Sequence, residues 1–181
     1  MIDGILEFTF RPKVNRKSSS LLFSVLMALS AVGVLASVIS PKYKGVISLA
    51  AIVLICASLF VFVRYMSGIY SYVVMYGSGG EPMLVITKTT GKRVTTLGDF
   101  PLSSITHVTK CVGEQDQGIK AEKGIKKYNF CPNLRPAVTY RIAARGRDIA
   151  ADIIIEGSDE FADRIREYAA LARAYEKENE D

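Results

Sequence analysis

The sequence is poor in the side chains from which metal centres and catalytic sites are built. Its 181 residues contain one histidine, His107, and three cysteines, Cys56, Cys111 and Cys131, with no Cys-x-x-Cys pair among them. His107, Cys111 and Cys131 supply three ligands, whereas a closed structural zinc site needs four. Cys56 lies within an apolar run, where cysteine behaves as a small apolar residue. We therefore expect no metal, no cofactor and no catalytic residue.

The sequence also lacks a phosphate-binding loop. In a P-loop, a glycine stands five residues before the glycine of the Gly-Lys pair. Ile86 holds that position ahead of Gly91 and Lys92, and the local sequence TTGKR is that of a hairpin turn. A nucleotide-binding loop of this kind is thus excluded.

Two long stretches, 18–41 and 45–63, contain no charged residue. Each is about 20 residues long, the length that an α-helix needs to cross a hydrocarbon core of about 30 Å, and backbone in lipid must satisfy its own hydrogen bonds. We predict a transmembrane hairpin with helices at about 19–40 and 45–64. Two buried core helices would need a larger soluble core than the remaining chain offers, and the apolar region of a signal peptide is only about 7–15 residues long.

The net charge of +5 is concentrated around these apolar runs. Residues 1–66 hold seven basic and two acidic residues, so residues 67–181 are neutral. Four basic residues precede the first predicted helix, one follows the second and two lie in the connector: Arg11, Lys13, Arg16, Lys17, Arg64, Lys42 and Lys44. This distribution argues against a nucleic-acid partner, and the positive-inside rule predicts that both termini are cytoplasmic at the cell membrane.

Beyond residue 66 the pattern changes to short runs of β-branched and aromatic residues separated by turns. The predicted strands are 69–76, 83–88, 94–97, 103–112, 125–130, 137–144 and 149–156, with a polar loop at 113–124 and a turn, GDFP, at 98–101. Ser158 is a good N-cap for a helix at 158–177. In that helix, apolar residues recur at helical spacing at Phe161, Ile165, Tyr168, Ala172 and Tyr175.

This order of elements resembles that of small bacterial membrane proteins in which a two-helix hairpin precedes a PH-like (pleckstrin-homology-like) domain. The resemblance covers residues 19–177. It lies in the hairpin followed at once by strands from Tyr70, and in IIIEGSDEFADRI, which leads from the last strand to the helix. It implies an α+β membrane protein whose soluble domain has about seven antiparallel strands closed by a C-terminal helix, and it carries over no binding residue.

The expected parts follow the chain in order. An N-terminal segment at 1–18 includes GILEFTF, which can add a strand, and the hairpin occupies 19–66. The β-domain occupies 67–157, its closing helix 158–177, and a frayed tail 178–181. No linker rich in Pro, Gly or Ser follows the hairpin, so we expect the domain to sit directly against the membrane face.

One arrangement of side chains is chemically suggestive. If 102–112 and 125–131 pair as a simple hairpin, Cys111 lies opposite Cys131, and His107 shares the face of Cys111. Such a set is typical of a Cys–His pair, a disulfide or part of a metal site. The alternative, which we favour, is three ordinary strand residues, with His107 half-buried and the thiols kept reduced in the cytoplasm.

The stretch YNFCPNLRP at 128–136 is then a turn and not the loop of a nucleophile. Pro132 and Pro136 cannot continue a strand ladder, and Asn133 is a good turn former. Tyr128 and Phe130 are two residues apart, so in a strand they share one face, which we expect to be the core face.

Four lysines around the polar loop form a basic cluster: Lys120, Lys123, Lys126 and Lys127. Acidic residues lie in the same loop, so one interpretation is an ordinary solvated face. The other is contact with anionic lipid headgroups, which is worth about 1 kcal/mol for each basic residue near the surface.

Together these features predict a membrane-tethered binding module and not an enzyme. Its PH-like domain would bind a protein or peptide partner or lipid headgroups, and its helices would contact the bilayer or a second copy. An alternative is an accessory subunit of a transport or envelope complex, because small residues allow close helix approach at Ser24, Ala28, Gly33 and Ser37. Small residues at these positions would equally allow the two helices of the hairpin to pack against each other. A second alternative is a thiol enzyme that uses Cys131 and His107.

Overall fold

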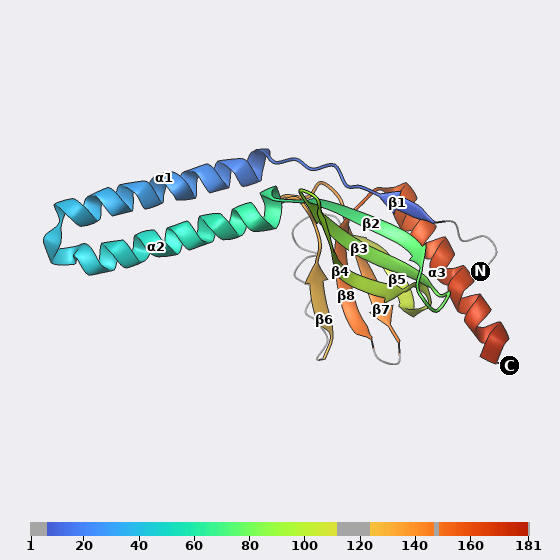
Figure 1. Cartoon of the computed structure of the whole chain (residues 1–181). Coiled ribbons are helices and arrows are strands. Elements are labelled where there is room, and N and C mark those ends of the chain that lie inside the picture. The colour runs from blue at the N-terminus through green and yellow to red at the C-terminus, as the bar shows by residue number, and fades with distance from the viewer. Residues whose placement is uncertain (1–6, 112–123, 147–148, 181) are drawn as a thin grey trace. The chain divides into compact units, whose positions relative to one another are not determined.

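The structure, a computed structural model, describes residues 7–111, 124–146 and 149–180, with side chains up to Glu178. Two compact units make up the chain (Figure 1). The hairpin unit consists of residues 14–68 and 133–135. The sandwich unit consists of the residues up to Lys13, 69–132 and 136–181.

The hairpin unit is built on two apolar helices. Helix α1 spans Lys17–Ile39 and helix α2 spans Lys44–Val61, joined by a 3-10 turn at Pro41–Tyr43. A π-helical turn at Phe62–Met66 extends α2. Both predicted helices are confirmed, and both are long and apolar enough to cross a membrane.

Small residues line the contact between α1 and α2. An added Cβ on Gly33 would lie 3.2 Å from the Cβ of Ala51, so Gly33 permits the close approach of the two helices. Ser37 is buried in the same contact, whereas Ser24 and Ala28 are exposed. Residues 24 and 28 do not share a helix face with residue 37 at 3.6 residues per turn, so of the four small residues only Gly33 and Ser37 belong to the packing within the hairpin, and contact of Ser24 and Ala28 with another helix stays a prediction.

The sandwich unit contains two four-stranded sheets among the described residues. The first sheet has the order β1-β2-β3-β4 and is antiparallel throughout. Its strands are β1 (Phe8–Phe10), β2 (Ile69–Tyr76), β3 (Pro82–Thr90) and β4 (Arg93–Pro101). The N-terminal strand expected from GILEFTF is thus confirmed at Phe8–Phe10, and it pairs with β2 on the far side of the hairpin in sequence.

The second sheet has the order β5-β7-β8-β6. Its strands are β5 (Ile105–Cys111), β6 (Lys126–Asn129), β7 (Thr139–Arg145) and β8 (Ala150–Glu156). Strands β5, β7 and β8 are antiparallel neighbours, and β6 lies parallel to β8 at the edge. The chain is therefore α+β, as predicted, with eight strands in its described part.

The core lies between the inner faces of the two sheets. Alternate positions over much of β2, β3, β7 and β8 are buried there, as alternation along a strand requires. The largest fully buried apolar side chains of the sandwich come from both sheets, from the β4–β5 connection and from the C-terminal helix: Tyr72, Val74, Leu84, Ile86, Leu102, Ile105, Tyr140, Ile142, Ile153, Ile155 and Ile165.

Helix α3 (Asp159–Glu180) closes one flank of the sandwich, which confirms the helix predicted at 158–177. It lies beside β1 in Figure 1. The ring of Phe161 stacks on Phe10 with centroids 4.6 Å apart and lies 5.8 Å from both Phe8 and Tyr72. Tyr168, two turns further along, meets Phe8 at 5.9 Å. Aromatic pairs at these distances add to the energy of simple area burial.

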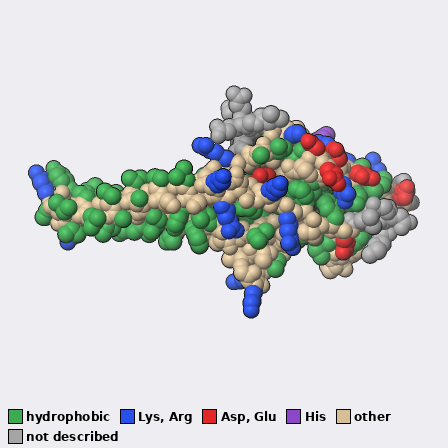
Figure 2. All heavy atoms as spheres, turned by 90° about the horizontal axis from the view of Figure 1, so that it is seen from above, with side chains coloured by type: hydrophobic (Ala, Val, Ile, Leu, Met, Phe, Trp, Pro, Cys, Tyr) green, Lys and Arg blue, Asp and Glu red, His purple; other side chains and the backbone are tan. Residues whose placement is uncertain are grey.

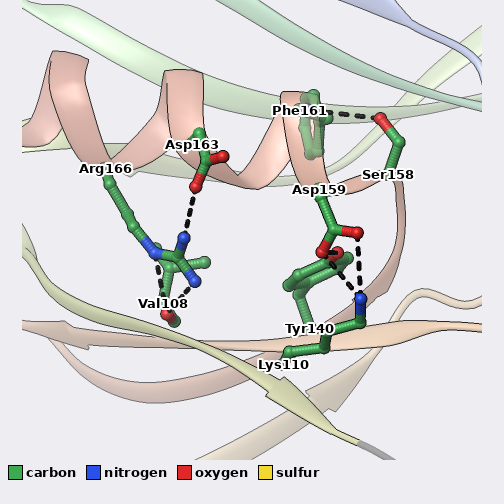
Figure 3. A network of polar contacts seen from close by, with 8 residues as sticks. All are labelled: Val108, Lys110, Tyr140, Ser158, Asp159, Phe161, Asp163 and Arg166. Atoms are coloured by element: carbon green, nitrogen blue, oxygen red, sulfur yellow. Dashed lines mark hydrogen bonds and ion pairs between the residues drawn. The ribbon is translucent and has the colours of Figure 1, made fainter.

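Polar contacts tie the same helix to the second sheet (Figure 3). Asp159 accepts hydrogen bonds from Lys110 of β5 at 2.8 Å and from the Tyr140 hydroxyl of β7 at 2.6 Å. Burial, together with this bond to Asp159, raises the pKa of Tyr140 to about 12. Two turns later, Arg166 donates to the carbonyl oxygen of Val108 at 2.9 Å. At the helix start, Ser158 accepts from the Phe161 N–H at 3.2 Å, as an N-cap does.

A buried ion pair occupies the outer face of the second sheet. The carboxylate of Asp152 on β8 is 1% exposed and accepts hydrogen bonds from Arg141 and, at 2.8 Å, from Arg145, both on β7. Burial alone would raise the pKa of the Asp152 carboxyl group, but the hydrogen bonds and charges of the two arginines outweigh burial and lower it.

Candidate functional site

A groove lies between two sheet edges, at the flank away from α3. Strand β4 ends the first sheet and β6 ends the second, and residues of both strands line a cavity of about 450 Å³ together with the start of β8. This volume is within the range of about 300–1,000 Å³ that is usual for ligand sites. We name it the β4–β6 groove.

Three aromatic rings connect the two sheets at this groove. Phe100 of β4 lies 6.2 Å from Tyr128 of β6, and Tyr128 stacks on Phe130 at 5.9 Å. Phe100 and Phe130 are buried, whereas Tyr128 is 36% exposed and lines the cavity. The prediction that Tyr128 and Phe130 share a face is confirmed. That face is the core for Phe130 and the groove wall for Tyr128.

A β-bulge shapes the wall on the β4 side. Ile86 faces Gly98 but Thr87 faces Thr96, so Leu97 is the extra residue and lines the groove. A bulge re-aims side chains at a sheet edge. An added Cβ on Gly98 would lie 2.9 Å from the Phe100 ring, so glycine is what allows the rings to pack against β4.

The predicted turn at GDFP is wrong, because residues 98–101 belong to β4. Gly98, which made the segment look like a turn, in fact marks the bulge. A glycine within a strand is a known signal of a bulge or of close backbone approach. The sequence therefore contained a pointer to this wall, which the turn interpretation missed.

Both strands offer backbone hydrogen-bonding groups at the groove. Within the described part of the chain, β4 pairs only with β3, and β6 pairs only with β8. One edge of each strand therefore has no strand partner there, and such edges are templates for pairing with another chain. Asp99 and Lys126 add one charge of each sign to the lining, and Ile149 adds apolar surface.

No protein-family model, curated protein or solved structure matches this chain.

The suggested set of Cys111, Cys131 and His107 depends on a pairing that the structure contradicts. Strand β5 pairs with β7, and β6 lies at the opposite edge of the sheet with β7 and β8 between them. The Cα partner of Cys111 is Thr139 and not Cys131. The long loop does not close a hairpin, because the segment that follows it joins the far edge of the sheet, parallel to β8.

The predicted face of His107 is also wrong. A register shift between Ile105 and His107 breaks the alternation of β5. Ile105, Val108 and Cys111 are buried, whereas His107 and Thr109 are exposed. His107 is therefore a surface residue and not a half-buried one. Within the described residues, no three His, Cys, Asp or Glu side chains gather as metal ligands.

The segment CPNLRP at 131–136 contains no strand or helix, as predicted for a turn, but it connects β6 to β7 without joining paired strands. Cys131 and Pro132 are buried. Residues 133–135 belong to the hairpin unit, in which the Asn15 N–H donates to Asn133 Oδ1 at 2.7 Å. The connection from β6 to β7 therefore contains residues of both units.

Of the four lysines predicted as weak headgroup contacts, Lys120 and Lys123 lie outside the described residues. Lys126 and Lys127 are exposed on β6. Because successive residues of a strand point to opposite faces, these two do not form one patch. Lys126 lines the β4–β6 groove, and Lys127 shares the other face of the sheet with Asp152, its Cα partner on β8.

Proposed function

We propose that the chain is a two-span membrane protein that holds a PH-like domain at the cytoplasmic face of the cell membrane, where the β4–β6 groove binds an extended segment of a partner protein. The observation that carries the proposal is the groove itself. It combines apolar rings, a bulged wall and two strand edges that pair with no other described strand.

The surface of the hairpin supports the membrane part of the proposal. Hydrophobic side chains are prominent along the visible face of the hairpin (Figure 2), and only 11% and 17% of the apolar 18-residue stretches in the two spans are buried. The exposed fractions reach 74% at Val38, 80% at Ile39 and 73% at Val46. A core helix of a soluble protein would bury such residues, whereas a bilayer solvates them at no cost in hydrophobic energy.

The pairing of β1 with β2 supports a single orientation for both termini. β1 precedes the hairpin and β2 follows it, yet Thr9 and Val73 are partners in one sheet. A folded sheet lies on one side of a membrane, so both ends of a spanning hairpin emerge on that side. Arg16, Lys17 and Arg64 flank those ends, which favours the cytoplasm under the positive-inside rule.

The sheet topology supports the PH-like interpretation of the domain. Two sheets of antiparallel strands are followed by a helix that closes one flank, and seven strands with a closing helix is the expected order of elements. Strand β6, predicted at 125–130 as one of the seven antiparallel strands, departs from this plan, because it pairs parallel to β8 at the edge of the second sheet. Strand β6 forms the second wall of the groove.

The groove favours an extended peptide because both of its walls are strand edges. A peptide that adds as a strand to β4 gains main-chain hydrogen bonds, and its alternate side chains enter the apolar groove beside Leu97 and Tyr128. Asp99 and Lys126 would fix its direction through complementary charges. We therefore expect an occupant with apolar residues at alternate positions and a charged residue of each sign.

The test selects peptides from a displayed random library against the full chain in uncharged detergent micelles. Leu97→Lys should weaken binding of a selected peptide by about tenfold or more, because it places a charge in the apolar wall. Met75→Lys on the outer face of the first sheet is the matched control, since Met75 is 40% exposed and Leu97 is 37% exposed. Equal loss in both variants, or no selected peptide sensitive to Leu97→Lys, would refute the groove as the binding site.

The membrane topology has its own test. A reporter active only in the cytoplasm should work when fused after Asp181, and one active only outside it should work when inserted at the connector near Lys42. The reverse pattern would overturn the orientation, and the same compartment for both positions would overturn the two-span hairpin.

A further inference from the structure

A second cleft, separate from the β4–β6 groove, carries a set of basic side chains. It lies between the C-terminal half of α3 and the edge of the second sheet and has a volume of about 590 Å³. Arg145 at the end of β7 and Arg173 and Lys177 of α3 line it, together with the hydroxyl groups of Ser103 and Thr106. Glu176 is the one acidic side chain in the lining.

The two arginines are held in place by other contacts. Arg145 donates to Asp152 at 2.8 Å and to the carbonyl oxygens of Ala144 and Ala151 at 2.9 Å and 2.8 Å. Arg173 uses Nε to donate to the carbonyl oxygen of Ala169 at 3.1 Å. Both guanidinium groups are therefore fixed at the cleft wall, and fixed donors lose less entropy when a ligand binds.

The charge of the cleft is not balanced from within. Asp152 is shared between Arg141 and Arg145, whereas the terminal nitrogens of Arg173 and the ammonium of Lys177 make no hydrogen bond or ion pair with the side chains described up to Glu178. Arg173 and Lys177 are also four residues apart on one helix, where like charges repel. The acidic Glu176 accepts instead from Ser103 at 3.4 Å.

We propose that this cleft binds a phosphate monoester group. Arg173 and Lys177 supply two positive charges against the one negative charge of Glu176, so the surplus charge of these three residues is positive, and charge-assisted hydrogen bonds of this kind are the strongest that side chains form with phosphate. Ser103 and Thr106 supply hydroxyl groups beside them. The phosphate belongs either to a lipid headgroup or to a soluble phosphate ester, and the cleft recognises the phosphate monoester group that both contain.

The experiment uses the full chain in uncharged detergent micelles, because β1 precedes the hairpin and a truncated domain would lack this strand. In one arm, inorganic phosphate is titrated against chloride at constant ionic strength. In the other, phosphatidic acid is added to the micelles, with the phosphodiester lipid phosphatidylglycerol as its control. The readout in both arms is the midpoint of thermal unfolding, followed by circular dichroism.

A saturable rise of the midpoint is expected with phosphate, with phosphatidic acid or with both, and not with phosphatidylglycerol. Arg173→Gln and Lys177→Gln should each raise the half-saturating concentration by about tenfold or more. Arg164→Gln is the matched control on the same helix, because Arg164 pairs with Glu160 outside the cleft and should behave as the native chain does.

The two arms also separate the sources. A response at much lower ligand concentration with phosphatidic acid identifies a lipid headgroup, and an equal or stronger response to inorganic phosphate identifies a soluble ester. Absence of a saturable rise in both arms would overturn the site. So would equal half-saturating concentrations in the native chain and in both cleft variants, because the response would then come from general salt effects.

Discussion

The two flanks of the sandwich differ in what covers them. On one flank, the edge strands β1 and β5 meet α3, and rings from three elements pack together with Phe161 at their centre. On the other flank, the edge strands β4 and β6 line a cavity, and Tyr128 is left 36% exposed beside it. Aromatic side chains are found at both flanks: they pack against α3 on the first and line the cavity on the second.

The difference teaches that an apolar ring stabilises a fold or offers a binding surface according to whether the chain supplies its partner. Phe161 is 2% exposed because β1 and β2 provide rings around it. Tyr128 has rings on the core side only. The unpaired area of such a ring is available to another molecule, and aromatic residues are enriched among the residues that dominate binding energy.

The largest expected effect comes from removing the ring at the centre of the closed flank. Phe161→Ala should lower the free energy of unfolding by about 3–5 kcal/mol, because it leaves a cavity among the three buried or half-buried rings of Phe8, Phe10 and Tyr72. The measurement is denaturant unfolding of the full chain in detergent. Tyr128→Ala on the open flank is the control and should cost clearly less, since part of that ring is already in water. Equal losses would mean that the two flanks are equally packed.

The second effect is expected at the pair between the central strands, which belongs to neither flank. Asp152→Asn should lower the free energy of unfolding by about 1–3 kcal/mol at neutral pH, because two arginines lose a buried charged partner. The lowered pKa of Asp152 stabilises the native chain above the unfolded pKa of about 3.9, and this stability is lost as the pH falls through the lower native pKa.

The check is the midpoint of unfolding as a function of pH for the native chain and for Asp152→Asn. The difference between the two should shrink as the pH falls below about 4. A difference that stays constant down to pH 2 would show that Asp152 does not carry the charge that the two arginines require.

A smaller effect is expected at the bulge of the open flank. Gly98→Ala should lower the free energy of unfolding by about 1 kcal/mol, as measured by denaturant unfolding. The reason is that the added Cβ would press on the Phe100 ring, whose far end can shift. Gly79→Ala is the control, since its Cβ would meet no atom within 4 Å. The same variant also tests the groove, because the displaced ring should weaken the binding of a peptide selected for the groove, measured as its affinity for the variant and for the native chain. Unchanged stability and binding would mean that the bulge does not need glycine.

The smallest effect concerns Cys131, which follows β6 on the open flank. It is 3% exposed, so iodoacetamide should modify it slowly in the folded chain and at the rate of an ordinary thiol after denaturation. Mass spectrometry of the peptide that contains Cys131 measures both rates, and Cys111, which is 6% exposed, is the internal control. Rapid modification of Cys131 alone near pH 6 would mean that the open flank frays, and it would restore the thiol-enzyme alternative.

The sequence predicted local structure well where one pattern dominates. The apolar runs gave α1 and α2, and the helical stripe through Phe161 and Ile165 gave α3. The strand at 69–76 has the bounds of β2. Prediction was less successful where a local signal has two interpretations, as at Gly98, which is typical of a turn and of a bulge alike.

The candidate site was harder to predict because it depends on pairing between distant strands. The sequence predicted which strand face Tyr128 shares with Phe130, but not which residue of another strand its ring contacts. Its partner Phe100 comes from the other sheet, and the wall at Ile149 comes from the segment leading into β8. The hairpin expected between 103–112 and 125–131 was the simplest closure of the intervening loop, and the structure instead pairs β6 with β8.

The sequence by itself determined which segments avoid water and which secondary structure each adopts, because hydropathy and periodicity act over a few residues at a time. The sequence alone indicated two long charge-free helices, a series of strands and one amphipathic helix. Only the tertiary structure decided that β1 and β2 join across the hairpin, that β6 lies parallel to β8, and that one flank is closed while the other is open. Strand order is a competition among edges that are chemically alike, and it is settled by the packing of the whole core and not by any segment alone.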